Sequence, residues 1–162
     1  MVVTFCGHRE VSNAEDVQEW LYEKIEKLIQ SGANTFVMGG YGEFDFMAAS
    51  VVCELKKKYL NVKSILVLPY RNIKFDKNKY DGVLYPCMNG VSEKYAIIRC
   101  NQWMVDWSDI LVAYVERNWG GAVKTLKYAE EKRKIVIQHN IMDVDLRIKN
   151  GNSKIKNNNE MR

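Results

Sequence analysis

Two short segments combine glycine with polar side chains, as ligand-binding loops do. They are GGYGEFD at residues 39–45 and NWGGAVKT at residues 118–125. Glycine lets backbone amides approach a ligand closely, and free amides at the start of a helix favour a bound anion. A carboxylate in the same place repels phosphate, but it can accept hydrogen bonds from sugar hydroxyls or act as an acid or base. The two segments therefore predict different chemistry.

The segment at residues 118–125 is the better phosphate loop. It has no carboxylate between Asn118 and Thr125, and Lys124 and the Thr125 hydroxyl lie close to its two glycines. We predict that this loop contacts the phosphate of a ligand through Asn118, Gly120, Gly121 and Thr125. A tight turn without any ligand is the alternative interpretation of the two glycines.

The segment at residues 39–45 suits a ribose or an acid–base step. Glu43 and Asp45 put negative charge where a phosphate needs amides alone. If any residue of the chain is catalytic, the prediction is Asp45. The ligand-binding residues predicted in this segment are Gly39, Gly40, Tyr41, Glu43, Phe44 and Asp45. The alternative is that the two carboxylates only stabilise the first turn of a helix by complementing its dipole.

Further polar residues lie next to other strand-like runs, in GHRE at residues 7–10 and PYR at residues 69–71. Arginine supplies fixed donors for phosphate or carboxylate groups. The additional ligand contacts predicted are Gly7, His8, Arg9, Arg71, Arg99 and Asn101. For His8, a hydrogen bond to backbone at a strand end is an equal alternative. Neither glycine segment matches GxxxxGK[ST] or GxGxxG, which argues against ATP hydrolysis and NAD dehydrogenation.

Alternating strand and helix patterns must position these residues. Five continuous apolar runs predict strands at residues 2–6, 34–38, 64–69, 109–115 and 134–138. Stripes at spacings of three and four predict helices at residues 15–31, 46–59, 92–107 and 122–133. Continuous apolar runs indicate strands buried on both faces, as in parallel sheets. The chain is therefore predicted to be α/β, with a doubly wound, mainly parallel five-stranded sheet and helices on both faces.

The carboxyl ends of the strands are the expected ligand site. In an open parallel sheet, ligands bind there, near the point where the strand order reverses. The segments GHRE, GGYGEFD, PYR and ERNWGGAVKT each follow one of the first four runs, so the fold should bring them together. Residues 70–90 are long for a connection between a strand and a helix. They predict a binding loop or lid, with a mere excursion as the alternative.

Composition favours a single soluble domain. The 162 residues are 47% hydrophobic and 27% charged, which is typical of globular proteins. No apolar run approaches the roughly 18 residues of a membrane span, and the N-terminus lacks the layout of a signal peptide. The four cysteines form no CxxC pair, and Cys6 with His8 has no further ligands at zinc spacing. We expect a cytoplasmic protein with reduced thiols, no metal and no membrane contact.

The positive charge lies at the C-terminal end. The net charge is +4, and residues 147–162 carry five basic residues against one acidic residue. Residues 1–146 are therefore formally neutral, whereas a folded DNA-binding domain usually has a basic face. We predict one domain at residues 1–146 and a basic, Asn/Lys-rich, flexible tail at residues 147–162. A solubilising tail is favoured over a nucleic-acid arm.

The order of motifs resembles the YpsA-like group of the SLOG superfamily, which includes the Lonely Guy enzymes and the DNA-processing protein A domain. The resemblance covers Val2 to Gln138, and it rests on the following motifs in combination: FCGHRE, GGYGEFDFMAASVV, LVLPY, RCNQWMVDWSDILVAY and WGGAVKTLKYAEEKRKIV. It implies a Rossmann-like fold that binds a nucleotide or nucleotide-sugar at the strand ends.

The Lonely Guy enzymes are phosphoribohydrolases with the signature PGGxGTxxE. Gly120, Gly121 and Thr125 match its phosphate-loop residues, with one extra residue before the threonine. Tyr128 stands in the place of the glutamate, and no proline precedes the glycines. The resemblance therefore supports the phosphate loop better than it supports the hydrolase chemistry.

Three hypotheses follow for the function. The first is binding or sensing of a nucleotide or nucleotide-sugar, such as an ADP-ribose-like ligand, with no other cofactor. The second is an enzyme that cleaves or transfers an N-glycosidic bond with Asp45 as its carboxylate. The third, less favoured because the domain is formally neutral, is DNA binding. Relatives of this fold often dimerise, so a homo-oligomer is an open alternative.

Overall fold

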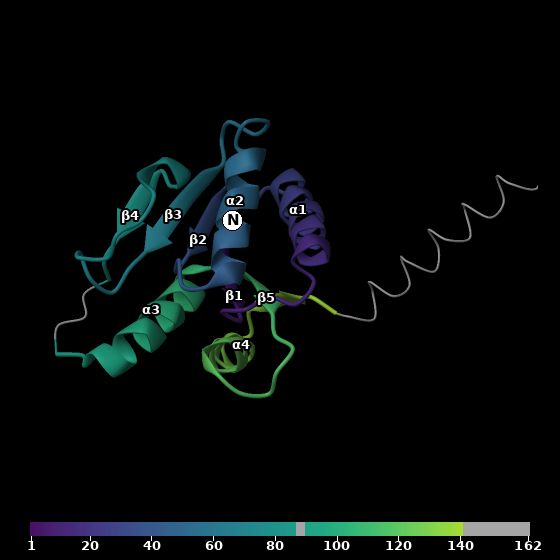
Figure 1. The fold of residues 1–162 in the computed structure, drawn as a ribbon. Coiled ribbons are helices and arrows are strands. Elements are labelled where there is room, and N and C mark those ends of the chain that lie inside the picture. The colour runs from purple at the N-terminus through teal and green to yellow at the C-terminus, as the bar shows by residue number, and fades with distance from the viewer. Residues whose placement is uncertain (87–89, 141–162) are drawn as a thin grey trace, which may run out of the picture.

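Strands and helices alternate along the chain (Figure 1). The computed structural model describes residues 1–86 and 90–140. The strands are β1 (Val2–Gly7), β2 (Thr35–Met38), β3 (Lys63–Val67), β4 (Gly82–Leu84), β5 (Ile110–Tyr114) and β6 (Ile135–Gln138). The helices are α1 (Ala14–Gln30), α2 (Glu43–Leu55), α3 (Glu93–Trp107) and α4 (Gly121–Glu131), with a 3-10 turn η1 (Lys77–Lys79).

All neighbouring strands pair in parallel, in the order β4-β3-β2-β1-β5-β6. The chain moves outward from β1 through β2, β3 and β4, and it returns to the other side of β1 with β5 and β6. The strand order therefore reverses between β1 and β5, which is where such sheets bind ligands. The predicted Rossmann-like, doubly wound α/β fold is confirmed.

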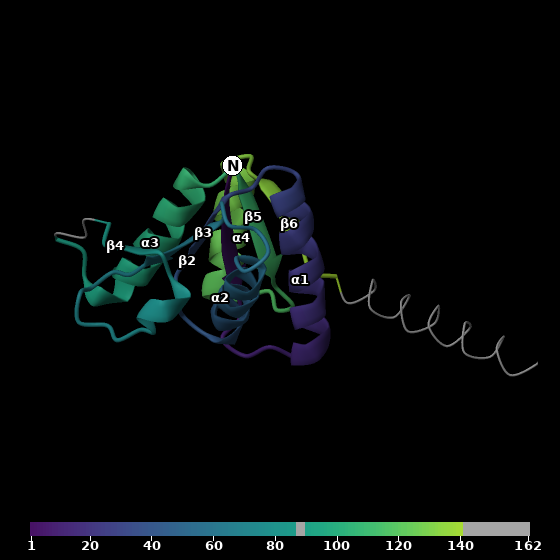
Figure 2. The same cartoon turned by 90° about the horizontal axis from the view of Figure 1, so that it is seen from above.

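The helices form two layers, one on each face of the sheet (Figures 1 and 2). Successive strand residues point to opposite faces. Val3 and Phe5 of β1 belong to the core cluster that includes α1 and α2 residues, whereas Cys6 packs with residues of α3 and α4. Both faces are thus buried, which explains why the strands have continuous rather than alternating apolar patterns.

The sheet has six strands, so the prediction of five strands is wrong by one. The additional strand, β4, pairs with β3 through Ile65 and Gly82, Leu66 and Val83, and Val67 and Leu84. It has only three residues at the sheet edge and none of them is fully buried, so it leaves no apolar run in the sequence. Residues 70–90, interpreted as an irregular loop, therefore contain an ordered strand.

Helix α2 begins at Glu43, three residues before the predicted start at residue 46. Gly42 has a φ of 109°, and the amide of Phe46 donates to its carbonyl, so the helix starts directly after it. The helix ends at Leu55, four residues before the predicted end at residue 59. Asp45 therefore lies in the first turn of the helix.

Residues 147–162, the predicted tail, lie outside the described part of the chain. Within that part, no helix is both long enough and apolar enough to cross a membrane. Residues 1–86 and 90–140 also hold no group of three or more acidic, histidine or cysteine side chains able to bind a metal. Cys6, Cys53 and Cys100 are free thiols, while Cys87 falls outside the described residues.

Candidate functional site

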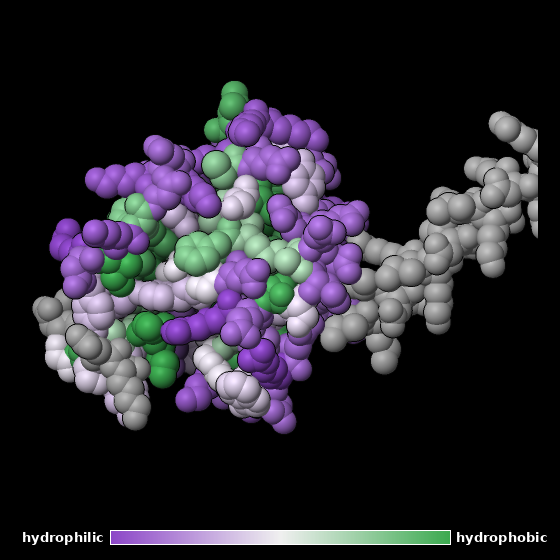
Figure 3. All heavy atoms as spheres, viewed as in Figure 1, coloured by the Kyte–Doolittle hydropathy of each residue, from purple (hydrophilic) through white to green (hydrophobic). Residues whose placement is uncertain are grey.

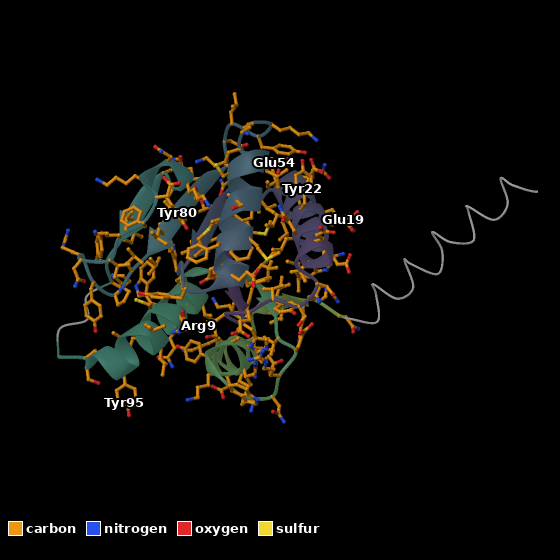
Figure 4. The ribbon with its side chains drawn as sticks, in the orientation of Figure 1. Arg9, Glu19, Tyr22, Glu54, Tyr80 and Tyr95 are labelled. Atoms are coloured by element: carbon orange, nitrogen blue, oxygen red, sulfur yellow. The ribbon has the colours of Figure 1, made fainter. Side chains whose placement is uncertain are left out.

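A cleft of about 400 Å³ opens at the carboxyl ends of β1 and β5. Its described lining is Phe5, Cys6, Gly7, His8, Arg9, Glu10, Tyr41, Asp45, Ile97, Asn101, Arg117, Trp119, Gly120, Gly121, Ala122 and Thr125. Figure 4 places Arg9 where α2, α3 and α4 converge. On the same face in Figure 3, hydrophilic side chains gather in this region and hydrophobic patches lie beside them. The cleft thus coincides with the reversal of the strand order.

The loop before α4 presents open backbone to the cleft. Gly120 is the residue before the helix, with a φ of 102° that favours glycine, and the first intrahelical amide bond runs from Lys124 to its carbonyl. The amides before Lys124 have no partner inside the helix. A Cβ built at Gly120 or Gly121 would have no atom of a more distant described residue within 4 Å. These amides can therefore receive an anion, and no acidic residue lies in the first turn to repel it.

The loop before α2 is packed against its surroundings. A Cβ at Gly42 would lie 2.7 Å from the Cα of Arg9, and a Cβ at Gly40 would lie 3.0 Å from Leu66. The amide of Glu43 donates to the Arg9 carbonyl (2.9 Å), and its carboxylate accepts from the Val11 amide (2.8 Å). Glu43 therefore fastens this loop to the one after β1.

Asp45 is the carboxylate of α2 that reaches the cleft. Its Oδ2 accepts a hydrogen bond from the Tyr41 amide at 2.9 Å. The side chain is partly buried, and burial raises the pKa of Asp45 from 3.8 to about 7. A carboxyl group with such a pKa can both accept and release a proton near neutral pH, which suits an acid or a base.

His8 lines the cleft, but its ring is used inside the protein. Its Nε2 accepts hydrogen bonds from the amides of Glu116 at 3.0 Å and Arg117 at 3.1 Å. Burial lowers the pKa of His8, and the neighbouring Arg117 lowers it further. A neutral ring is required, because the protonated form has no free lone pair to accept these bonds. His8 thus anchors the loop after β5 to the end of β1.

Gly7 makes room for an aromatic pair beneath the cleft. A Cβ at Gly7 would lie 2.3 Å from the Phe44 ring, which is fully buried. The Phe44 ring stacks on Tyr114 with centroids 5.6 Å apart. The Tyr114 hydroxyl in turn accepts a hydrogen bond from the Ser12 amide (3.0 Å). Phe44 therefore supports the cleft from below and does not line it.

Two arginines give the cleft positive charge. The exposed Arg9 side chain has no hydrogen bond or ion pair with another residue of the described chain. The guanidinium of Arg117 lies over the Trp119 ring, 5.4 Å from its centroid, and 3.9 Å from the Glu10 carboxylate. Of these two arginines, Arg9 is thus the one whose guanidinium has no partner among the described residues and can meet an anionic ligand.

The structure brings together nine of the residues predicted from the sequence, namely Gly7, His8, Arg9, Tyr41, Asp45, Asn101, Gly120, Gly121 and Thr125. Those outside the described lining are Gly39, Gly40, Glu43, Phe44, Arg71, Arg99 and Asn118. Arg71 lies over the Tyr85 ring at 4.7 Å, and Arg99 borders a separate groove with Trp103 and Asp106.

Seven lining residues were not predicted, namely Phe5, Cys6, Glu10, Ile97, Arg117, Trp119 and Ala122. Arg117 and Trp119 had a usable signal, because both stand between the fourth apolar run and a double glycine. Cys6 had no such signal in the sequence. In the structure its Sγ faces the carbonyl of Ala122 at 3.8 Å, and burial raises the pKa of its thiol. A raised pKa makes a thiol a poor nucleophile.

Comparisons with known proteins agree with the motif order. The sequence model of YpsA, described as the YspA SLOG family, matches residues 8–146. No curated protein shows a significant match.

Three solved structures are similar to the chain. DNA processing protein A from Helicobacter pylori, described for its single-stranded DNA binding mode, has a TM-score of 0.62 at 15% identity over 87% of this chain and 66% of its own. A structural genomics target, TM1055, has a TM-score of 0.59 at 13% identity over 83% and 71%. The molybdenum cofactor carrier protein from Chlamydomonas reinhardtii has a TM-score of 0.55 at 16% identity over 85% and 74%.

The TM-scores show a shared fold, and at these low identities the similarity extends no further than the fold. The chain spans slightly less than two thirds of the Helicobacter pylori protein.

Proposed function

We propose that this chain, which belongs to the YpsA SLOG family, binds a nucleotide or nucleotide-sugar in the cleft at the strand ends. The observation that carries the proposal is the open backbone at Gly120 and Gly121, where an added Cβ would meet nothing within 4 Å. These glycines face open space, the first amides of the helix have no partner among the described residues, and no carboxylate lies in the first turn. Such an arrangement suits a phosphate group.

We assign the ribose of the ligand to the side of the cleft that contains Asp45 and Asn101. Asp45 can accept hydrogen bonds from ribose hydroxyls while its Oδ2 also accepts one from the Tyr41 amide. Arg9, which has no ion pair with the described residues, adds a guanidinium at the same cleft for a second phosphate or another anionic group. An ADP-ribose-like ligand has both kinds of group.

Similar folds that carry ligands support a binding role. The Helicobacter pylori neighbour binds single-stranded DNA, and the algal neighbour is a carrier of molybdenum cofactor. DNA binding therefore stays as a competing hypothesis for this chain, and the binding experiment below includes a single-stranded oligonucleotide to test it.

An N-glycosidic hydrolase or transferase is the second candidate. The observation that favours it is Asp45, whose pKa of about 7 lets the carboxyl group exchange a proton near neutral pH within the cleft. In such a reaction the carboxylate would stabilise positive charge on the ribose or activate the attacking nucleophile. A binding protein needs no such proton exchange.

Calorimetric titration tests the proposal with AMP, ADP-ribose, NAD and a single-stranded oligonucleotide. At least one of the three nucleotides should bind, and Gly121→Asp should weaken that binding by about 10-fold or more, because it adds negative charge at the phosphate amides. The matched control is Asn61→Asp, which adds the same charge to an exposed residue before β3, at the opposite end of the strand.

The outcomes separate the hypotheses. Equal affinities for wild type and Gly121→Asp would remove the phosphate assignment. Binding of the oligonucleotide alone would favour the DNA hypothesis. Release of free base, detected by chromatography and abolished in Asp45→Asn while binding persists, would favour the enzyme. Binding without any release would leave the chain as a binding protein.

A further inference from the structure

Trp119 is an exposed aromatic side chain at the cleft. Its side chain is 65% exposed, although indole is among the largest apolar groups that a protein can bury. Other large hydrophobic residues of the described chain are also exposed, for example Phe46, Tyr95 and Trp107, but of the exposed set Trp119 is the one in the cleft lining. An aromatic surface is therefore left open at the place where a ligand would bind.

The surroundings of Trp119 hold its ring at the cleft. The Arg117 guanidinium lies 5.4 Å from the ring centroid, which is within the range of a cation–π interaction. The backbone of the same loop is held by His8, whose Nε2 accepts from the amides of Glu116 and Arg117. The loop is thus anchored two residues before Trp119, which keeps the backbone that carries the indole at the cleft.

We propose that Trp119 is the stacking surface for the planar ring of the ligand, so that the cleft selects phosphate esters that carry a nucleobase over sugar phosphates without one. This inference rests on the proposed function. Trp119 directly precedes Gly120, and consecutive Cα atoms are about 3.8 Å apart, so the indole begins beside the amides assigned to the phosphate. One ligand can therefore reach both features.

The chemistry of the indole favours a base over the other parts of a nucleotide. Every nucleobase has a π face that stacks on an aromatic side chain without requiring a particular sequence of hydrogen bonds. Ribose and phosphate have no such face. Stacking would also cover apolar surface that the free protein leaves in water. The positive charge of Arg117 lies next to the same ring, where it can attract the phosphate of the ligand.

Calorimetric titrations with AMP and ribose 5-phosphate, which share the sugar and the phosphate, test the inference. Trp119→Ala should lower AMP affinity roughly 10-fold and leave ribose 5-phosphate affinity within about twofold, while Trp119→Phe should keep most of the AMP affinity. The matched control is Trp107→Ala, on α3 and outside the described cleft lining, which should change neither affinity. AMP should also quench indole fluorescence in wild type and Trp107→Ala more than in Trp119→Phe.

Two results would overturn the inference while the proposed function stands. One is an unchanged AMP affinity in Trp119→Ala, and the other is an equal loss for AMP and ribose 5-phosphate, which would mean that the ring only shapes the loop. If wild-type protein binds neither compound and none of the other nucleotides, the proposed function fails and the inference fails with it. Melting temperatures of all variants show whether a loss of affinity reflects a loss of folding.

Discussion

The loops before α2 and α4 begin their helices with the same backbone conformation but have opposite surroundings. Gly42 has φ 109° and ψ 176°, and Gly120 has φ 102° and ψ −178°. A Cβ at Gly42 would lie 2.7 Å from the Cα of Arg9, whereas a Cβ at Gly120 would meet nothing within 4 Å. One loop is closed by the protein itself, and the other is open toward the cleft.

The difference shows that glycines with the same backbone conformation can be packed against the protein or face open space. In the loop before α2, Glu43 already uses its amide and its carboxylate to bind the loop after β1. In the loop before α4, no side chain of the first turn is acidic. A helix N-terminus is therefore a better candidate anion site where its first amides make no internal hydrogen bond and its glycines face open space.

The largest predicted effect on stability is the loss from Gly42→Ala. The substitution combines an unfavourable positive φ with a clash against backbone, so the free energy of unfolding should fall by about 3 kcal/mol. Gly120→Ala has the same positive φ in open space and should cost less, about 1 to 2 kcal/mol. Urea denaturation of both variants measures the difference.

Equal losses in the two variants would contradict this contrast, because they would mean that the clash with Arg9 adds nothing to the strain of the positive φ. The wild-type protein and both variants should have the same slope of free energy against urea if only the native state is affected.

An intermediate effect is predicted for Asp45→Asn, and its sign depends on pH. The pKa of Asp45 is about 7 in the folded protein against 3.8 for the free side chain, so the folded state holds the proton more tightly. Between these values folding takes up a proton, and stability falls as the pH rises toward 7. Asparagine can still accept from the Tyr41 amide without carrying charge. At pH 8 the variant should be more stable by about 2 kcal/mol.

The same variant should have little advantage at pH 4, where Asp45 is protonated in the folded state and close to half protonated in the unfolded state, because pH 4 lies near the free pKa of 3.8. Thermal melts at pH 4, 6 and 8 follow the difference, and a difference that stays constant with pH would contradict the raised pKa. His8 contributes in the opposite direction: burial lowers its pKa, so its contribution is lost as the pH falls below about 6.5. The difference between wild type and variant isolates Asp45 because His8 is common to both.

The sequence predicts the sheet well because of how the strands are buried. The residues of β1, β2 and β5 face helices on both sides, so their apolar runs are continuous and easy to read. Strand β4 was missed because three partly exposed residues at an edge leave no pattern. Its position depends on Asp81, whose Oδ2 accepts from the Ser64 amide at 2.7 Å, a contact between residues far apart in the chain.

The sequence predicted the position of the cleft better than it predicted the set of residues that line it. The strand ends identified Arg9, Asp45 and the Gly120 loop, all of which lie in one cleft. The internal roles of other residues depend on long-range contacts, such as Glu43 with Val11, and no local pattern reports them. Trp119 was not predicted although its place before the double glycine was a usable signal, because a sequence does not show whether an aromatic residue beside glycines is buried or exposed.

The smallest predicted effect on stability separates the two loops most directly. Gly121 is the first residue of α4 and has no positive φ, and a Cβ there would meet nothing within 4 Å. Gly121→Ala should therefore leave the free energy of unfolding unchanged or raise it by about 0.5 kcal/mol, since alanine favours helix. If the glycine instead serves a phosphate, the methyl group should lower AMP affinity roughly 10-fold by blocking its approach to the amides.

The informative result is the comparison of stability and AMP affinity in two variants, Gly42→Ala and Gly121→Ala. Gly42→Ala should lose stability because its glycine serves the fold, whereas Gly121→Ala should lose affinity alone because its glycine serves the ligand. Urea denaturation without ligand and calorimetry with AMP measure the two quantities separately. If Gly121→Ala kept full AMP affinity, the open backbone before α4 would have no role in binding, and the contrast between the loops would be one of packing only.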